Sequence, residues 1–479
     1  MRECVSAGVR ECVSAGVREC VSAGVRECGS AGVRQCSAEA RRARRAASSS
    51  ARIPIPSAAR LTRGRDGGSI RAPTDDPSSH RTDILRDLTR HAPLQPLRRQ
   101  VHQSDEQTLA EQLELVRIPA PPFAEDARGE HVLGRFAALG LCDAHRDEVG
   151  NVLGAWRPEG AEGPPVVVAA HLDTVFPAGT SVEPRTQGKR IHAPGITDNC
   201  RGLAGMLAVA RVLAPSDVRA PRPVLFAATV GEEGIGDLRG AKHLFREGSP
   251  LRGAAAFIAL DGSGLRRIVH RAIGSRRLRI EIEGPGGHSW SDRGVANPVA
   301  VLGSAIAGLG GLPLPHPDRS ALTVARIGGG SSVNAIPEEA WMELDLRSEV
   351  PGVLGRMEDD VRAILARAAE AQNGARRGGT QPLRTRIQVI GDRPSGETPA
   401  AHPLVRAATA ITGSMGAQAE LVGSSTDANV PMALGIPSIA IGAGGDSGGI
   451  HTLDEWYAND GGALGVERAL LVVLAAAGV

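Results

Sequence analysis

Three short apolar segments constrain the fold of this chain most strongly, because each is continuous rather than alternating with polar residues. They are PPVVVAAHLDTV, PVLFAATVGEEG and AAAFIALDGSG. Between the first two lies NCRGLAGMLAVARVLAP, whose apolar residues recur at helical spacing. A strand that is apolar on both faces belongs in the middle of a sheet that helices cover on both sides. Strands that alternate with helices in this way predict an α/β layer fold.

The pattern changes at about Gly274. RRLRIEIEGPGG alternates charged and apolar residues, as a strand with one solvated face does. A helix (NPVAVLGSAIAGLGGL), two strands (SALTVARIGGG and AWMELDLRS) and another helix (MEDDVRAILARAAEAQ) follow. We therefore expect a small α+β domain over 274–385, inserted into an α/β domain made of 104–273 and 386–479. Ser104 is the expected N-cap of the first helix.

Residues 1–103 are expected to lie outside both domains. The octapeptide VRECVSAG recurs, and the repeat carries five cysteines: Cys4, Cys12, Cys20, Cys28 and Cys36. It is either a thiolate array for metal or a low-complexity segment read from a start codon upstream of the true one. We favour the second, because metal motifs pair cysteines about two to four residues apart. Arg, Ser, Ala and Pro clusters then predict a disordered basic linker.

Composition argues against nucleic acid and membrane as partners. The formal net charge is +2 and aromatic residues make up 2% of the chain, so neither strong attraction to anionic polymers nor base stacking is expected. The Arg-rich stretch alone would permit a nucleic-acid tail, but it lacks aromatic residues and a folded module. No apolar run approaches the roughly 20 residues of a membrane span. No signal peptide is visible, and we expect a cytoplasmic protein.

Histidine and acidic residues stand at or just past the predicted strand ends, where open α/β sheets bind ligands. Each alone has an ordinary interpretation: a surface pair, a turn residue, a helix N-cap or a loop histidine. Together, two imidazoles and several carboxylates suit a pair of metal ions. Adjacent acids need a cation or a proton, so one of the pair can ligate and the other act as general base. The residues are His171, Asp173, Asp198, Glu232, Glu233, Asp261 and His451.

The motifs that hold these residues resemble a known family. HLDTV, APGITDNCRG, VGEEG, ALDG and GGIHTLDEW, in this order, are similar to those of the zinc exopeptidases. That family includes peptidase T, carboxypeptidase G, the aminoacylases, acetylornithine deacetylase and succinyl-diaminopimelate desuccinylase, and the peptidase T-like members are the most similar. The resemblance covers about residues 106–477. It implies a mixed-sheet catalytic domain and an inserted ferredoxin-like lid through which two subunits form a homodimer.

The resemblance also implies a metal centre of two Zn²⁺ per subunit, with Co²⁺ or Mn²⁺ as possible substitutes. In that centre Asp198 bridges both ions. His171 and Asp261 complete one site, and Glu233 and His451 complete the other.

Further roles follow from the same resemblance. Glu232 matches the general base, and Asp173 matches the residue that supports a metal-binding histidine. In the lid, His288 matches a histidine that reaches the partner subunit's active site and stabilises an oxyanion. Asn334 and Arg347 match positions that bind a substrate carboxylate. For Arg347, an ordinary surface arginine is an equal alternative.

The substrate expectation rests on the third acidic ligand. In the family, Asp at the place of Asp261 is typical of peptidases and Glu of deacylases. We therefore expect a di- or tripeptidase or an aminopeptidase acting on small peptides, with an N-acyl-amino-acid deacylase as the alternative. A non-catalytic dimeric binding protein is disfavoured, because the seven matched positions are intact. Loops with Thr426, Asp427 and Asn429 are expected to shape the pocket.

Overall fold

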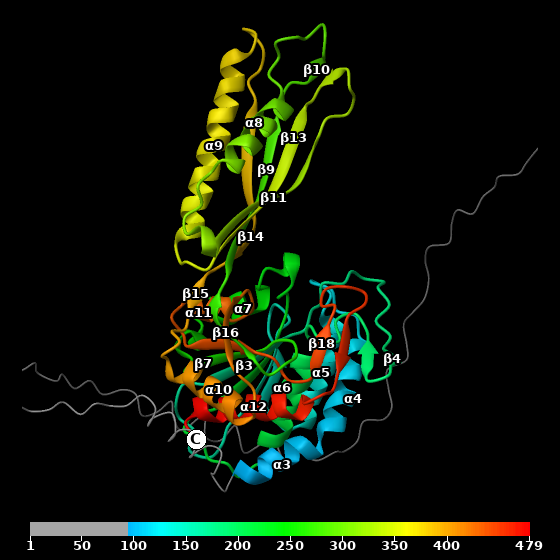
Figure 1. Cartoon of the computed structure of the whole chain (residues 1–479), viewed down its shortest axis with the longest axis vertical. Coiled ribbons are helices and arrows are strands. Elements are labelled where there is room, and N and C mark those ends of the chain that lie inside the picture. Colours follow the sequence, from blue (N-terminus) through cyan, green and yellow to red (C-terminus); the bar gives the residue numbers. More distant parts are fainter. Residues whose placement is uncertain (1–93) are drawn as a thin grey trace, which may run out of the picture. The chain divides into compact units, whose positions relative to one another are not determined.

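The computed structural model describes residues 94–479 (Figure 1), so the expectations for the cysteine repeat and most of the linker lie outside the described residues. A mixed sheet of nine strands forms the centre of the larger domain, in the order β1-β2-β6-β3-β7-β17-β8-β15, with β16 also pairing β8. The strands are β1 Cys142–Arg146, β2 Val152–Trp156, β3 Val166–His171, β6 Val224–Thr229, β7 Ala256–Leu260, β8 Arg267–Ala272, β15 Gly396–Glu397, β16 Glu420–Ser424 and β17 Ser438–Ile441.

The three continuous apolar segments are β3, β6 and β7, the neighbouring strands in the middle of this sheet. β3 pairs in parallel with both of the others, and all of its residues are buried. Val166 and Val168 pack into one core cluster, while Val167 and Ala169 pack into another on the opposite face. Burial on both faces explains why these strands have no polar alternation. The α/β prediction is confirmed.

Helices cover both faces of the central sheet. The larger core cluster holds residues of α4, α6 and α12, and most residues of α6 and α12 are buried. The other cluster holds residues of α7 and α11. The helices of this domain are α3 Gln95–Gln103, α4 Asp105–Val116, α5 Asp126–Ala138, α6 Cys200–Leu213, α7 Arg239–Leu244, α10 Pro403–Ser414, α11 Asn429–Ala433 and α12 Gly462–Ala477.

The domain begins earlier than the sequence indicated. α3 lies within the segment expected to be linker, and its Leu97 and Val101 are buried in the core. Arg98 and His102 of the same helix both contact the Glu467 carboxylate. Ser104 is the N-cap residue of α4, as predicted, but its hydroxyl donates to the carbonyl of Val101 and makes no cap hydrogen bond.

The inserted domain has a four-stranded antiparallel sheet in the order β11-β13-β9-β14. Leu278, Ile280 and Ile282 of β9 face a core shared with helices α8 and α9 (Figure 1). Two short strands, β10 and β12, pair with each other. The elements are β9 Gly274–Glu283, β10 Gly287–His288, α8 Pro298–Gly310, β11 Ser320–Gly329, β12 Ala335–Ile336, β13 Glu339–Ser348, α9 Val353–Ala375 and β14 Arg384–Arg393.

The strand β14 corrects the expected domain boundary. It pairs with β9 along its length, so the inserted domain runs from Gly274 to Arg393 rather than to 385. β14 is an edge strand and is mostly exposed. It therefore lacks the apolar run that identifies a buried strand.

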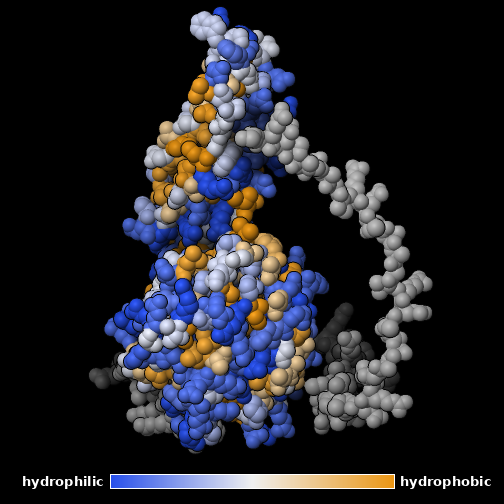
Figure 2. Space-filling model, turned by 90° about the vertical axis from the view of Figure 1, so that its right-hand side faces the viewer, coloured by the Kyte–Doolittle hydropathy of each residue, from blue (hydrophilic) through white to orange (hydrophobic). Residues whose placement is uncertain are grey.

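A smaller four-stranded sheet has the order β18-β19-β5-β4, and Ser447 of β18 contacts Ser263 in the loop after β7. Its strands are β4 Arg185–Gln187, β5 Arg190–His192, β18 Asp446–Gly448 and β19 Trp456–Ala458. The surface drawn in Figure 2 mixes hydrophilic and apolar residues. No helix within residues 94–479 combines the length and the apolarity needed to cross a membrane.

Candidate metal centre

The central sheet delivers four of the candidate side chains to one edge. His171 is the last residue of β3, Glu232 and Glu233 follow β6, and Asp261 comes directly after β7. Because these strands are parallel neighbours, their carboxyl ends meet at the same edge.

The other two ligand candidates come from elsewhere, so the expectation that all follow strands of one sheet is wrong. Asp198 precedes Asn199, and it is Asn199, not Asp198, that caps helix α6 by accepting from the Gly202 N–H. His451 lies between β18 and β19 of the smaller sheet. Its φ of 66° is unusual for a residue with a Cβ, a conformation that is enriched at functional sites.

The five ligand candidates form two groups that share Asp198. His171 Nε2 lies 3.0 Å from Asp198 Oδ1 and 3.9 Å from Asp261 Oδ1. His451 Nε2 lies 2.9 Å from Asp198 Oδ2 and 3.0 Å from Glu233 Oε1. In each group the ligand atoms all lie within 4.8 Å of one another. His171, Glu232 and Glu233 form a third, overlapping group. The two oxygens of Asp198 thus face two different histidines.

The electrostatics of the cluster favour cations. Burial raises the pKa of Asp261 to about 7, and the Asp198 carboxylate adds to that shift. Burial also raises the pKa of Glu232 well above its usual range, against the opposing charges of Arg393 and His171. Hydrogen bonds to Asp198 and Glu233 raise the pKa of His451 to about 10.

The donor atoms also fit metal ions. Apart from its 3.0 Å contact with His171 Nε2, the buried Oδ1 of Asp198 has no hydrogen-bond partner within the described part of the chain. Imidazole nitrogens and carboxylate oxygens are among the ligands that Zn²⁺ takes in proteins.

Asp173 holds the loop that carries the two glutamates. Its Oδ1 and Oδ2 accept the backbone N–H groups of Glu232 and Glu233, at 2.9 and 2.8 Å. His171 Nδ1 lies 3.0 Å from the Asp173 backbone carbonyl and 3.6 Å from its carboxylate. Asp173 therefore contacts His171 chiefly through its main chain, which fixes the ring so that Nε2 faces the cluster.

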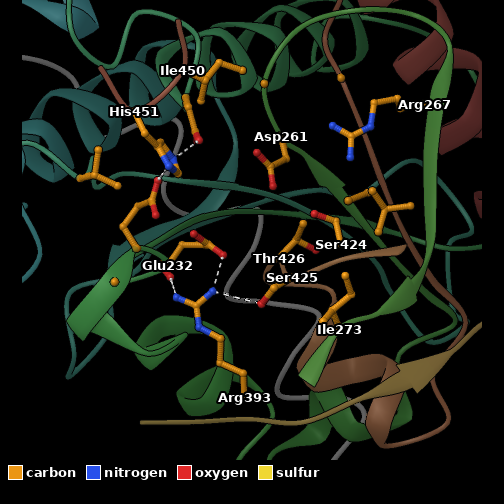
Figure 3. A pocket seen from close by; sticks show the side chains of 18 of the residues that line it. Glu232, Asp261, Arg267, Ile273, Arg393, Ser424, Ser425, Thr426, Ile450 and His451 are labelled. Carbon is orange, nitrogen blue, oxygen red and sulfur yellow. Dashed lines mark hydrogen bonds and ion pairs between the residues drawn. The ribbon is translucent and has the colours of Figure 1, made fainter. Parts of the chain in front are cut away.

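Two buried residues of the site were not foreseen from the sequence. Glu455 accepts the backbone N–H groups of Gly195, Thr197 and Asp198 at 3.0, 2.7 and 3.1 Å. Arg393 donates from Nη1 to Glu232 Oε1 at 3.2 Å and from Nη2 to the Glu232 carbonyl (Figure 3). Glu455 belongs to the motif GGIHTLDEW that also contains His451. Because Glu455 is acidic, nothing in the motif indicated that its side chain is buried. No sequence signal marks Arg393.

A pocket of about 710 Å³ opens over the cluster. Glu232, Asp261, Thr426 and His451 line it (Figure 3). Arg347 of β13 lines it as well, with its Nε 2.8 Å from Asp345 Oδ2.

His288 and Asn334 do not line the pocket. Both are exposed and lie at the β10–β12 pair, where the Ser289 N–H donates to the Asn334 carbonyl. Within one chain the structure therefore does not bring these two residues to the metal cluster.

The three loop residues Thr426, Asp427 and Asn429 make different contacts. Only Thr426 of the three lines the pocket. Asp427 accepts from the Thr229 hydroxyl at 2.5 Å. Asn429 Nδ2 donates to the carbonyls of Ile273 and Pro394, both at 2.9 Å, and so joins the two segments that enter and leave the inserted domain.

The fold and the site define a metal-dependent hydrolase. Residues 167–474 match the peptidase family M20/M25/M40, and the chain belongs to this family of metallopeptidases. The resemblance found in the sequence motifs is thereby confirmed. No curated protein matches the chain.

Solved structures share the fold. The aminopeptidase PepT of Bacillus cereus is 22% identical with a TM-score of 0.64, over 78% of this chain and 99% of that one. A tripeptidase of Staphylococcus aureus is 23% identical with a TM-score of 0.64, over 78% and 98%. A dinuclear metal-binding peptidase of Bacillus subtilis is 16% identical with a TM-score of 0.58, over 78% and 98%. These matches confirm the α/β fold with its inserted domain.

Proposed function

We propose that this chain is a dinuclear zinc exopeptidase that cleaves an amide bond in di- or tripeptides. The observation that carries the proposal is the Asp198 carboxylate, whose two oxygens lie 3.0 and 2.9 Å from His171 and His451. A carboxylate shared by two ligand groups suits a pair of ions about 4 Å apart. His171 and Asp261 complete one group, and Glu233 and His451 complete the other.

The side chains of the pocket account for the remaining steps. Two Zn²⁺ ions supply Lewis acidity here when bound, which polarises a carbonyl oxygen and makes water more acidic. Glu232 takes the proton of the attacking water and later gives it to the leaving amine. Burial of the Glu232 side chain raises its pKa, which suits a group that must both accept and return a proton. Arg347 pairs with a substrate carboxylate in this proposal, and its position in the pocket lining supports that role.

The substitution Glu232→Gln tests the general base. It keeps the size of the side chain but removes the proton acceptor, so turnover should fall by about 10²- to 10⁴-fold while the zinc content stays unchanged. Turnover is measured by mass spectrometry on dipeptides, tripeptides and N-acyl amino acids, with zinc content by atomic spectroscopy. Glu247→Gln, at an exposed site, serves as the control.

Several outcomes would count against the proposal. A Glu232→Gln variant with near-normal turnover would exclude Glu232 as the base. Full activity after removal of the metal with a chelator would exclude the metal centre. Hydrolysis of N-acyl amino acids alone would assign the chain to the deacylases instead.

We further propose that the inserted domain forms a homodimer and delivers His288 to the partner subunit's pocket. β11 is an edge strand of the inserted sheet, with Ile327 exposed on it and Val333 exposed beyond its end. Unpaired edges with exposed apolar residues favour association with a second copy.

A further inference from the structure

The loop that carries the candidate base is fastened to the inserted domain at three points. Arg393, the last residue of β14, contacts Glu232. The backbone N–H of Asp392 donates to the Asp237 carboxylate at 3.0 Å, and Arg277 of β9 donates to the carbonyl of Gly234 at 2.6 Å. Residues 232–237 are thus held by two strands of a different domain.

The register of the inserted sheet explains why Arg393 faces this loop. Ser275 of β9 lies directly opposite both Arg347 and Arg393 on the neighbouring strands. Residues directly opposite each other point to the same face of a sheet, and so does Arg277, two residues along. Leu278 points to the opposite face, into the core against α8 and α9. Arg277, Arg347 and Arg393 therefore project from the face of the inserted sheet that the helices do not cover.

Arg393 contacts both the side-chain carboxylate and the main-chain carbonyl of Glu232. Nη1 lies 3.2 Å from Oε1 of the carboxylate and Nη2 contacts the main-chain carbonyl. The Ser425 hydroxyl, 3.2 Å from Nη1, is a further partner of the guanidinium. Both partners of the ion pair are buried, at 6% and 7% side-chain exposure. Two planar, directional contacts restrict the side chain and the backbone of one residue together.

We infer that Arg393 is a positioning residue that makes the orientation of Glu232 depend on the inserted domain. The inference rests on the proposed role of Glu232 as general base. Because Arg393 occupies Oε1, it fixes the plane of the carboxylate and leaves Oε2 to face the pocket. A displacement of the base by about 1 Å can lower the rate by about 10²-fold. A shift of the end of β14 that carries Arg393 therefore changes the position of the Glu232 side chain directly.

A purely structural ion pair predicts a different set of measurements. Loss of such a pair would lower the melting temperature and the folded fraction, with the kcat of the folded molecules unchanged. Loss of a positioning contact lowers kcat itself, leaves KM and zinc content nearly unchanged, and is partly reversed when a free guanidinium ion fills the vacated space.

The test compares Arg393→Ala and Arg393→Lys with Arg279→Ala in the full-length, zinc-loaded protein. Arg279 lies on the same face of β9 but pairs with Glu281 and Glu343, away from the base. We expect kcat to fall about 10²-fold in Arg393→Ala and less in Arg393→Lys, with Arg279→Ala near wild type. Millimolar guanidinium should raise kcat of Arg393→Ala and leave wild type unchanged.

Wild-type kcat in folded Arg393→Ala would overturn the inference, as would a loss of kcat that guanidinium does not reverse. If Arg393→Ala does not fold, Arg393→Lys decides, because an ammonium group cannot replace the fork that spans the carboxylate and the carbonyl. Wild-type kcat in that variant overturns the inference too. Failure of the proposed function is distinguishable, because Glu232→Gln would then remain active whatever Arg393 does.

Discussion

Glu455 is a buried carboxylate that orients a candidate metal ligand, Asp198, through hydrogen bonds to the main chain. It has no exposed surface, and its two oxygens accept three backbone N–H groups from the segment that leads into Asp198. Burial raises the pKa of Glu455 to about 7, and the three N–H donors oppose that shift because they favour the ionised carboxylate. Glu455 therefore fixes the path of the main chain at Asp198, while Asp173 does the same for Glu232 and Glu233.

Glu455→Gln is expected to weaken zinc binding. The amide has the same size, but its NH₂ group would face backbone donors, so at least one N–H loses its acceptor. Changes in residues that orient ligands typically cost about 10- to 100-fold in metal affinity. Competition with a chromophoric chelator measures the change, and Asp454→Asn, at the exposed neighbouring position, is the control. Unchanged affinity in Glu455→Gln would show that the three hydrogen bonds do not fix Asp198.

The start of helix α6 brings Asp198 and Asp261 together. Asn199 Nδ2 donates to the carbonyl of Leu260 at 3.0 Å, and its Oδ1 accepts the N–H of Gly262 at 3.1 Å. Gly202 permits this close approach. A Cβ added at Gly202 would lie 2.2 Å from the Leu260 carbonyl oxygen and 2.0 Å from Asn199 Oδ1. The end of β7 and the first turn of α6 can meet only without a side chain there.

Gly202→Ala should therefore destabilise the protein by about 1–3 kcal/mol through overpacking, and should lower zinc affinity because Asp198 and Asp261 move apart. Gly134→Ala in α5 is the matched control, since a Cβ there meets nothing within 4 Å. That change should stabilise by up to about 1 kcal/mol through helix propensity. Urea denaturation of both variants gives the comparison. Equal stabilities would show that α6 moves away from β7 at little cost.

The elements that the sequence predicted well are those whose burial is visible in their own amino-acid composition. β3, β6 and β7 are apolar on both faces, so their composition identifies them as central strands. β14 and α3 were missed because an edge strand and a terminal helix bury little and keep polar residues. Arg393 and Glu455 were missed because their partners lie 161 and 257 residues away, and several of those partners are backbone atoms that leave no pattern in the sequence.

The pocket of a single chain lacks two residues that the family resemblance assigns to the site, His288 and Asn334. His288 is exposed at the β10–β12 pair of the inserted domain and does not line the pocket of its own chain. If His288 serves the reaction, a second copy must supply it. An isologous dimer through the edge strand β11 would exchange the two histidines symmetrically.

Subunit complementation tests this exchange. His288→Ala and Glu232→Gln should each lose activity as homodimers, by about 10²-fold or more for a lost oxyanion donor. Mixed dimers contain one pocket with an intact Glu232 that receives His288 from the other chain. Because each mixed dimer has one complete site of two, purified mixed dimers should show about half of wild-type activity, and a randomly paired mixture about a quarter. The variants are co-expressed with different affinity tags, and mixed dimers are purified through both. Purified mixed dimers with no more activity than either parent would show that His288 does not act across the interface.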